Sequence, residues 1–176
     1  DDSKLVEIQQ LANYLQEKGG AAIVCEASAH FAISALCSYQ GQYQEAEEAI
    51  RKATALMQHL PPTQLLCFVS YIRLLLNRGR VAEAKEIAEQ GLRALHGMGG
   101  CGFAVVKMRL AAAEAFRAVG ESEQADQELR ETLRQIRLRA EQIPNLAYRT
   151  KYLNGVPDNI RARKLASDWL GHDPFG

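Results

Sequence analysis

The chain has 176 residues, and its 21 Lys and Arg balance 21 Asp and Glu, so the formal net charge is zero. This balance excludes a global positive field that would attract nucleic acid or an anionic membrane surface. No apolar stretch approaches the roughly 20 residues that a membrane-spanning helix needs. With 5 prolines and 24% charged residues, the composition favours one all-α domain.

Apolar residues recur at intervals of three and four along most of the chain, which is the pattern of helices with one buried face. Glycines and prolines interrupt this pattern and end the helices. Helices are predicted at residues 4–18, 21–40, 43–60, 63–78, 81–95, 103–119, 122–141, 145–153 and from Pro157 onward. In the third of these, the residues expected to face inward are Ala46, Ala49, Ile50, Ala53 and Met57.

The last predicted helix has an apolar face that differs from its charged face. Its apolar residues are Ile160, Leu165, Ala166, Trp169 and Leu170, and its outward residues are Arg161, Arg163, Lys164 and Asp168. A terminal helix of this kind would cover the open end of a helical stack. Residues 172–176 are expected to form a loose tail.

Three short stretches of the chain are versions of one another. In each, a Gly ends one helix and an Ala lies five residues later in the next, as in Gly41 and Ala46, Gly79 and Ala84, and Gly120 and Ala125. The glycines are 38 residues (41 to 79) and 41 residues (79 to 120) apart. A period in this range is typical of stacked helix pairs, in which Gly lets the chain reverse and Ala lets two helices cross closely.

These repeats resemble the long variant of the tetratricopeptide repeat. In the first helix, the family's small positions correspond to Ser34, Ile72 and Ala113, and its bulky closing positions to Cys37, Leu75 and Phe116. The three glycines match the turn and are followed two residues later by Tyr43, Val81 and Ser122. In the second helix, the three alanines match the small position, and Ile50, Ala88 and Leu129 match the apolar position after it. His30, Phe68 and Arg109 stand where the family has an early aromatic residue. The resemblance implies a right-handed α-solenoid of about eight to nine helices in antiparallel pairs, with a C-terminal capping helix.

The repeat pattern divides the chain into segments. Residues 1–20 are expected to be the second helix of a truncated repeat, 21–60, 61–98 and 99–142 three full repeats, and 143–171 a partial repeat with the capping helix. The chain opens at Asp1-Asp2 without Met, which favours a piece of a longer protein. Residues around Tyr148, Tyr152, Trp169 and Leu170 resemble the C-terminal repeat regions of large bacterial signalling proteins, in which such repeats are joined to a kinase or a regulatory ATPase.

No catalytic, cofactor-binding or metal-binding site is predicted. His30, His59, His96 and His172 are scattered, and the four cysteines form no C-x-x-C pair. Reduced thiols in the core and a cytoplasmic location are therefore expected. Clustered carboxylates at Glu45, Glu47 and Glu48 fit a solvated face, as does the basic stripe of Arg130, Arg134, Arg137 and Arg139. That stripe lacks interleaved aromatics, which makes nucleic-acid binding a minor alternative.

The family's usual binding surface is the concave face formed by successive first helices. Carried over to this chain, its positions are Phe31, Ala35, Ser38, Val69, Arg73, Leu76, Leu110, Glu114 and Arg117, with Lys107 and Tyr39 at the margins. Ala35, Arg73 and Glu114 stand where some members have Asn for clamping a peptide's terminal carboxylate. The resemblance therefore implies a groove without that clamp, suited to an amphipathic helix or an extended segment.

Three functions stay open on the sequence alone. The leading hypothesis is a non-catalytic protein–protein interaction module of a larger bacterial signalling protein, which binds a partner segment or another domain of its parent chain on the concave face. The second is a small-ligand or peptide sensor that regulates a linked kinase, ATPase or transcription regulator. The third is self-association as a homodimer through the exposed N-terminal helix.

Overall fold

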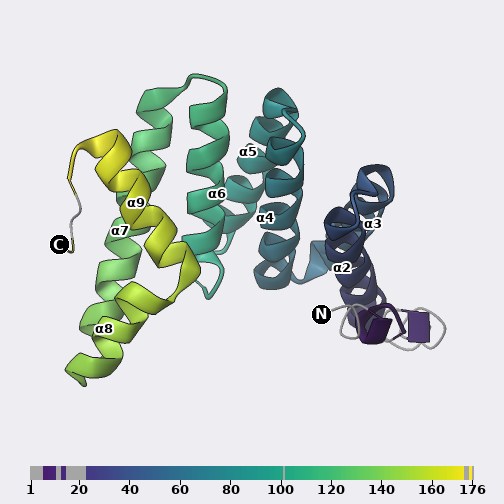
Figure 1. Cartoon of the computed structure of the whole chain (residues 1–176), viewed down its shortest axis with the longest axis horizontal. Coiled ribbons are helices and arrows are strands. Elements are labelled where there is room, and N and C mark those ends of the chain that lie inside the picture. Colours follow the sequence, from purple (N-terminus) through teal and green to yellow (C-terminus); the bar gives the residue numbers. More distant parts are fainter. Residues whose placement is uncertain (1–5, 11–12, 15–22, 101, 173–174, 176) are drawn as a thin grey trace.

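The structure is a computed structural model that describes residues 6–10, 13–14, 23–100, 102–172 and 175. Its described part contains helices and no strand, which confirms the predicted all-α class (Figure 1). The elements are α2 (Ile23–Tyr39), α3 (Tyr43–Leu56), the 3-10 turn η2 (Met57–His59), α4 (Pro61–Asn77), α5 (Val81–Gly97), α6 (Val105–Ala118), α7 (Ser122–Glu141), α8 (Leu146–Gly155) and α9 (Pro157–Leu170).

The helices stack as antiparallel pairs. α2 packs on α3, α4 on α5 and α6 on α7, and each pair then packs on the next through α3 against α4 and α5 against α6 (Figure 1). Contacts between α4 and α6 place these two first helices side by side. The described part of the chain is therefore an array in which each pair touches its neighbours in sequence.

The three predicted Gly turns share one hydrogen-bond pattern. Gly41, Gly79 and Gly120 have φ of 76°, 70° and 85°, the left-handed region that glycine adopts without strain. The residue after each glycine donates its backbone N–H to a carbonyl five residues earlier, at 2.8 Å for Gln42 to Cys37 and 3.0 Å for Arg80 to Leu75. The third turn repeats this bond at 2.9 Å. This is the Schellman termination, which satisfies the last carbonyls of a helix.

The small residues of the repeats lie where the helices cross. Ala46, Ala84 and Ala125 are each 0% exposed, early in the second helix of their pair. Nine other repeat positions are buried as well: Ser34, Ile72, Ala113, Cys37, Leu75, Phe116, Ile50, Ala88 and Leu129. Tyr43 and Ser122, which follow two of the turns, are exposed. A larger side chain at any of these alanines would push the two helices apart.

Two clusters of buried side chains form the core, and α6 contributes to both. One extends from α2 to α7 and contains Ile72 and Phe116, whereas the other joins α6, α7 and α9 around Leu110 and Leu165. Trp169 packs against both clusters. α9 is thus attached to the array by apolar contacts, mainly on α7 and α6.

α9 differs from its sequence prediction at two positions. Ile160, expected on the apolar face, is 48% exposed, whereas Ala162 is fully buried. Five residues of helix turn Ile160 about 140° away from Leu165, so the two cannot share a face. The corner before α9 is fixed by Asn159, which is 1% exposed and donates from Nδ2 to the carbonyl of Tyr152 at 2.9 Å.

The prediction of reduced thiols in the core has a mixed outcome. Cys37 and Cys67 are buried free thiols, and burial raises the pKa of Cys67 to about 11. Cys25 is exposed, so the prediction of a core thiol is wrong there. Cys101 lies outside the described residues, as does most of the helix expected at residues 4–18. None of the described helices is both long and apolar enough to cross a bilayer.

Gly79→Ala should destabilise the fold by about 1–2 kcal/mol, because an L residue at a φ of 70° brings its Cβ close to the following carbonyl. Gly97→Ala is the matched control. Gly97 lies at the end of α5 without a positive φ, and a Cβ there would meet no atom within 4 Å. Urea unfolding followed by circular dichroism should show a lower free energy of unfolding for Gly79→Ala and no decrease for Gly97→Ala. Equal effects would contradict the assigned role of the turn.

Candidate functional site: a charged groove between α4, α6 and α9

The concave-face residues predicted from the sequence do not all lie together. Val69 and Leu110 are 3% and 0% exposed, so their assignment to an accessible groove floor is wrong. Their side chains fill the spaces between helices, with Leu110 in the α6–α7–α9 cluster. From α2, Phe31 packs against the main core, while Ala35 is exposed and lies outside the groove described below.

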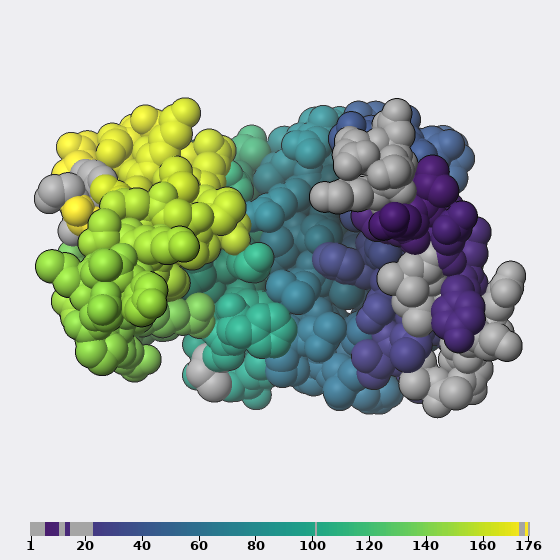
Figure 2. Space-filling model, turned by 60° about the horizontal axis from the view of Figure 1, so that its bottom comes forward, coloured from purple at the N-terminus to yellow at the C-terminus, as the bar shows by residue number. Residues whose placement is uncertain are grey.

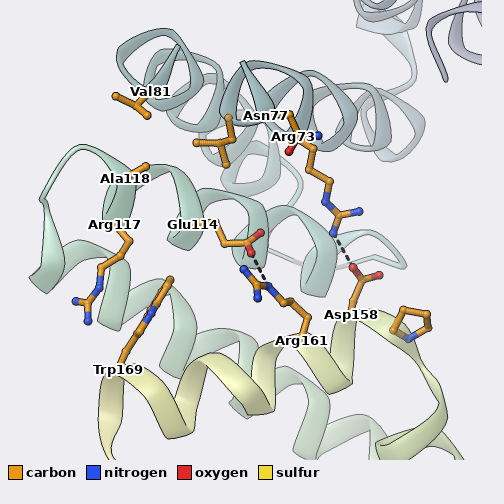
Figure 3. Close-up of a pocket in the computed structure, with 11 residues that line it drawn as sticks. Arg73, Asn77, Val81, Glu114, Arg117, Ala118, Asp158, Arg161 and Trp169 are labelled. Atoms are coloured by element: carbon orange, nitrogen blue, oxygen red, sulfur yellow. Dashed lines mark hydrogen bonds and ion pairs between the residues drawn. The ribbon is translucent and has the colours of Figure 1, made fainter. Parts of the chain in front are cut away.

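A groove of about 700 Å³ opens between α4, α6 and α9 (Figure 3). Its lining residues are Arg73, Leu76 and Asn77 of α4, Val81 at the start of α5, Glu114, Arg117 and Ala118 of α6, and Pro157, Asp158, Arg161 and Trp169 of α9. Four of the predicted residues, Arg73, Leu76, Glu114 and Arg117, are among them. Figure 2 shows the C-terminal helices, in yellow-green, adjoining the teal middle of the chain.

Asp158 connects three helices at one end of the groove. Its carboxylate accepts a hydrogen bond from Arg73 Nη2 of α4 at 2.7 Å and lies 3.4 Å from Lys107 Nζ of α6 (Figure 3 draws the first). The Asp158 side chain is 12% exposed, whereas those of Arg73 and Lys107 are 44% and 46% exposed. Lys107, predicted at the margin, therefore lies beside the groove and neutralises the carboxylate at its end.

A second ion pair crosses the groove between α6 and α9. Arg161 Nε donates to Glu114 Oε1 at 2.8 Å, and the two side chains are 50% and 17% exposed (Figure 3). Arg161 is exposed, as predicted for an outward residue, but the sequence did not indicate its pairing with Glu114. It lies one turn after Asp158, and this spacing places both side chains on the face of α9 that meets α4 and α6.

Arg117 and Trp169 form the opposite end of the groove. The Arg117 guanidinium lies over the indole ring at 4.7 Å from its centroid, which is within the range of a cation–π contact. Arg117 Nη1 also approaches Asp126 Oδ1 of α7 at 3.4 Å. The indole is held in place because it packs against both core clusters.

Sequence reasoning missed the α9 side of the groove. α9 packs on both α6 and α7 much as α6 packs on both α4 and α5, so α9 extends the concave face as well as covering the end of the stack. A signal for this was present, because Asp158, Arg161, Leu165 and Trp169 follow one another at intervals of three or four residues. Reading that stripe as one helix face would have placed the two charges beside the two apolar residues.

A second cluster of charges lies between α5, α6 and α7, around a cavity of about 760 Å³. Arg109 Nη1 donates to Glu128 Oε2 at 2.6 Å, and these side chains are only 11% and 13% exposed. Arg134 forms two bonds of 2.6 Å with Glu131. Part of the predicted basic stripe is therefore paired with carboxylates.

The described residues contain no group of three or more His, Cys, Asp and Glu placed to hold a metal ion. No protein-family model matches the chain, and no curated protein matches it either. Among solved structures, it is similar to BtubC (BKLC) from P. vanneervenii, with 20% sequence identity and a TM-score of 0.65. The match covers 96% of this chain and 70% of that one. At this identity the likeness shows the helical fold alone.

The Glu131 carboxylate should make stability depend on acid pH. The Arg134 hydrogen bonds lower its pKa from 4.5 to about 2. Because the folded pKa is depressed, its stabilising effect is complete above the unfolded pKa and is lost as pH falls through the folded value. Between pH 5 and pH 2, wild type should lose stability more steeply than Glu131→Gln in thermal melts. Glu123→Gln, at an exposed position of the same helix, should retain the wild-type slope; identical slopes for all three would contradict the assignment.

Proposed function

We propose that this chain is a non-catalytic, tetratricopeptide-like module for protein–protein interaction, which binds a segment of a partner protein in the groove between α4, α6 and α9. The observation that carries the proposal is the groove itself. Rigid helices hold an apolar floor of Leu76, Val81 and Trp169 beside guanidinium groups that remain partly exposed. A few apolar contacts beside fixed polar groups are the usual means by which helical arrays recognise peptides.

Two further observations support the tetratricopeptide-like assignment. The three Gly turns share φ values and hydrogen bonds, and the Ala five residues later is fully buried in each case. The setting proposed for the module is a larger bacterial signalling protein, on the resemblance of the residues around Tyr148 and Trp169. A partner segment could equally come from another domain of such a parent chain.

A small-ligand sensor is the second candidate, and the groove volume favours it. At about 700 Å³ the groove falls within the range of sites that bind small molecules. The homodimer hypothesis rests on the helix predicted at residues 4–18, most of which lies outside the described residues, so it stays a prediction.

Selection from a random 12-residue peptide library tests the interaction module. Peptides selected on wild type should bind Arg73→Gln/Arg117→Gln at least about tenfold more weakly, because truncating central Arg contacts costs more than 1 kcal/mol each. Gln is preferred to Glu because a carboxylate at position 73 would repel Asp158 and disturb α9. The matched control is Arg93→Gln on α5, whose side chain is 69% exposed outside the groove. Fluorescence anisotropy measures the affinities, and circular dichroism checks that all variants are folded.

If the selected peptides bind Arg73→Gln/Arg117→Gln with the same affinity as wild type and the Arg93→Gln control, binding lies outside the groove and the proposal is overturned. A metabolite screen by thermal shift separates the sensor hypothesis. A metabolite present at 100 times its Kd should stabilise wild type by about 2.7 kcal/mol, and the Arg73→Gln/Arg117→Gln variant far less. Stabilisation by a metabolite together with failure of every peptide would favour the sensor.

A further inference from the structure

One carboxylate of the chain already occupies the cationic end of the groove. Asp158 of α9 lies between Arg73 of α4 and Lys107 of α6, at 2.7 Å and 3.4 Å. The three groups come from three helices, and the two cations converge on a single acid. This arrangement is how a carboxylate from another chain would be held at the same place.

The two cations can change partner without any movement of the backbone. α9 is anchored by Ala162, Leu165 and Ala166 in the apolar cluster, and the bond from Asn159 to Tyr152 fixes its first turn. Arg73 and Lys107 instead have long side chains that are nearly half exposed. Rotation of these side chains toward the solvent side of the groove would leave the helices in place.

The charges around the groove favour binding of an acidic segment. Arg73, Lys107, Arg117 and Arg161 face the carboxylates of Asp158, Glu114 and Asp126. In the Asp158 and Glu114 pairs the carboxylate is the more buried partner, at 12% and 17% exposed. The exposed parts of these two ion pairs are therefore mainly the cationic groups, whose remaining N–H donors suit carboxylate oxygens.

We propose that the partner segment is acidic and that one of its carboxylates takes the place of Asp158 on Arg73 and Lys107. Asp158 is then a built-in competitor, which lowers the affinity of the groove for acidic segments and rejects weakly acidic ones. This inference rests on the proposed function, because it names the chemistry of the partner that the same groove binds. Arg117 and Trp169 would contact the apolar part of that segment.

The peptides selected on wild type provide the first test. Their Asp and Glu content should exceed that of the unselected library, and replacing their acidic residues with Gln or Asn should weaken binding by about tenfold or more. Affinity should also fall as NaCl is raised, because exposed charges are screened. Groove-dependent peptides without acidic enrichment would overturn this inference and leave the proposed function standing.

Asp158→Asn provides the second test, with Asp168→Asn at an exposed position of the same helix as its control. Removing the internal carboxylate should raise the affinity for the selected acidic peptides several-fold, toward the tenfold that corresponds to about 1.4 kcal/mol. The control should bind as wild type does. Unchanged or weaker binding by folded Asp158→Asn would overturn the competitor role.

A third variant covers the case in which Asp158→Asn folds poorly. Lys107→Gln keeps Asp158 and Arg73 paired, yet should weaken binding of an acidic peptide while leaving its Gln-substituted analogue unaffected. Equal effects on the two peptides would contradict the proposal that a peptide carboxylate binds Arg73 and Lys107. Failure of every peptide to depend on the groove would instead remove the proposed function itself, so the two failures can be told apart.

Discussion

Close crossing of the two helices in each pair is the constraint on which the structure depends, because it fixes where every first helix lies. Ala46, Ala84 and Ala125 have no exposed surface, and the Gly turns before them reverse the chain within a few residues. With the crossings fixed, α4 and α6 lie side by side, and α9 continues the row. The groove is a consequence of this arrangement, because it lies along the row that α4, α6 and α9 form.

The electrostatics of the groove follow from how deeply each helix places its charges. Short Asp and Glu side chains near the helix axes are shielded, whereas the longer Arg and Lys side chains reach past them into water. The exposed charge of the groove therefore depends on how deeply each group is buried as well as on the number of charges. Asp158 and Glu114 are satisfied within the array, and Arg73, Lys107 and Arg161 retain the exposed donors. Because the cations of these pairs are about half exposed, solvent screens the pairs and each contributes little to stability.

The repeat explains why much of the fold was predictable from the sequence. A Gly at a helix end and an Ala five residues later are local signals, and they located the starts of α3, α5 and α7 because each turn depends only on neighbouring residues. The errors arose where contacts join distant segments. Leu110 and Val69 were assigned to an open face by position in the repeat, but whether such a residue is exposed depends on the helix that stacks over it. The ion pair of Arg161 was missed because its partner Glu114 lies 47 residues earlier.

In a helical array, the residues that stabilise the fold differ from those that give the surface its charge. In this chain both kinds occur within single helices. In α6, Ala113 and Phe116 face the core, while Glu114 and Arg117 face the groove one position away. The buried apolar positions follow the period of the repeat and can be predicted from residue spacing alone. The groove positions obey no repeat, since Arg73 and Glu114 stand at equivalent places with opposite charge. Their roles can be interpreted only with α9 in place, because the pairs with Asp158 and Arg161 show which charges are shielded and which stay exposed.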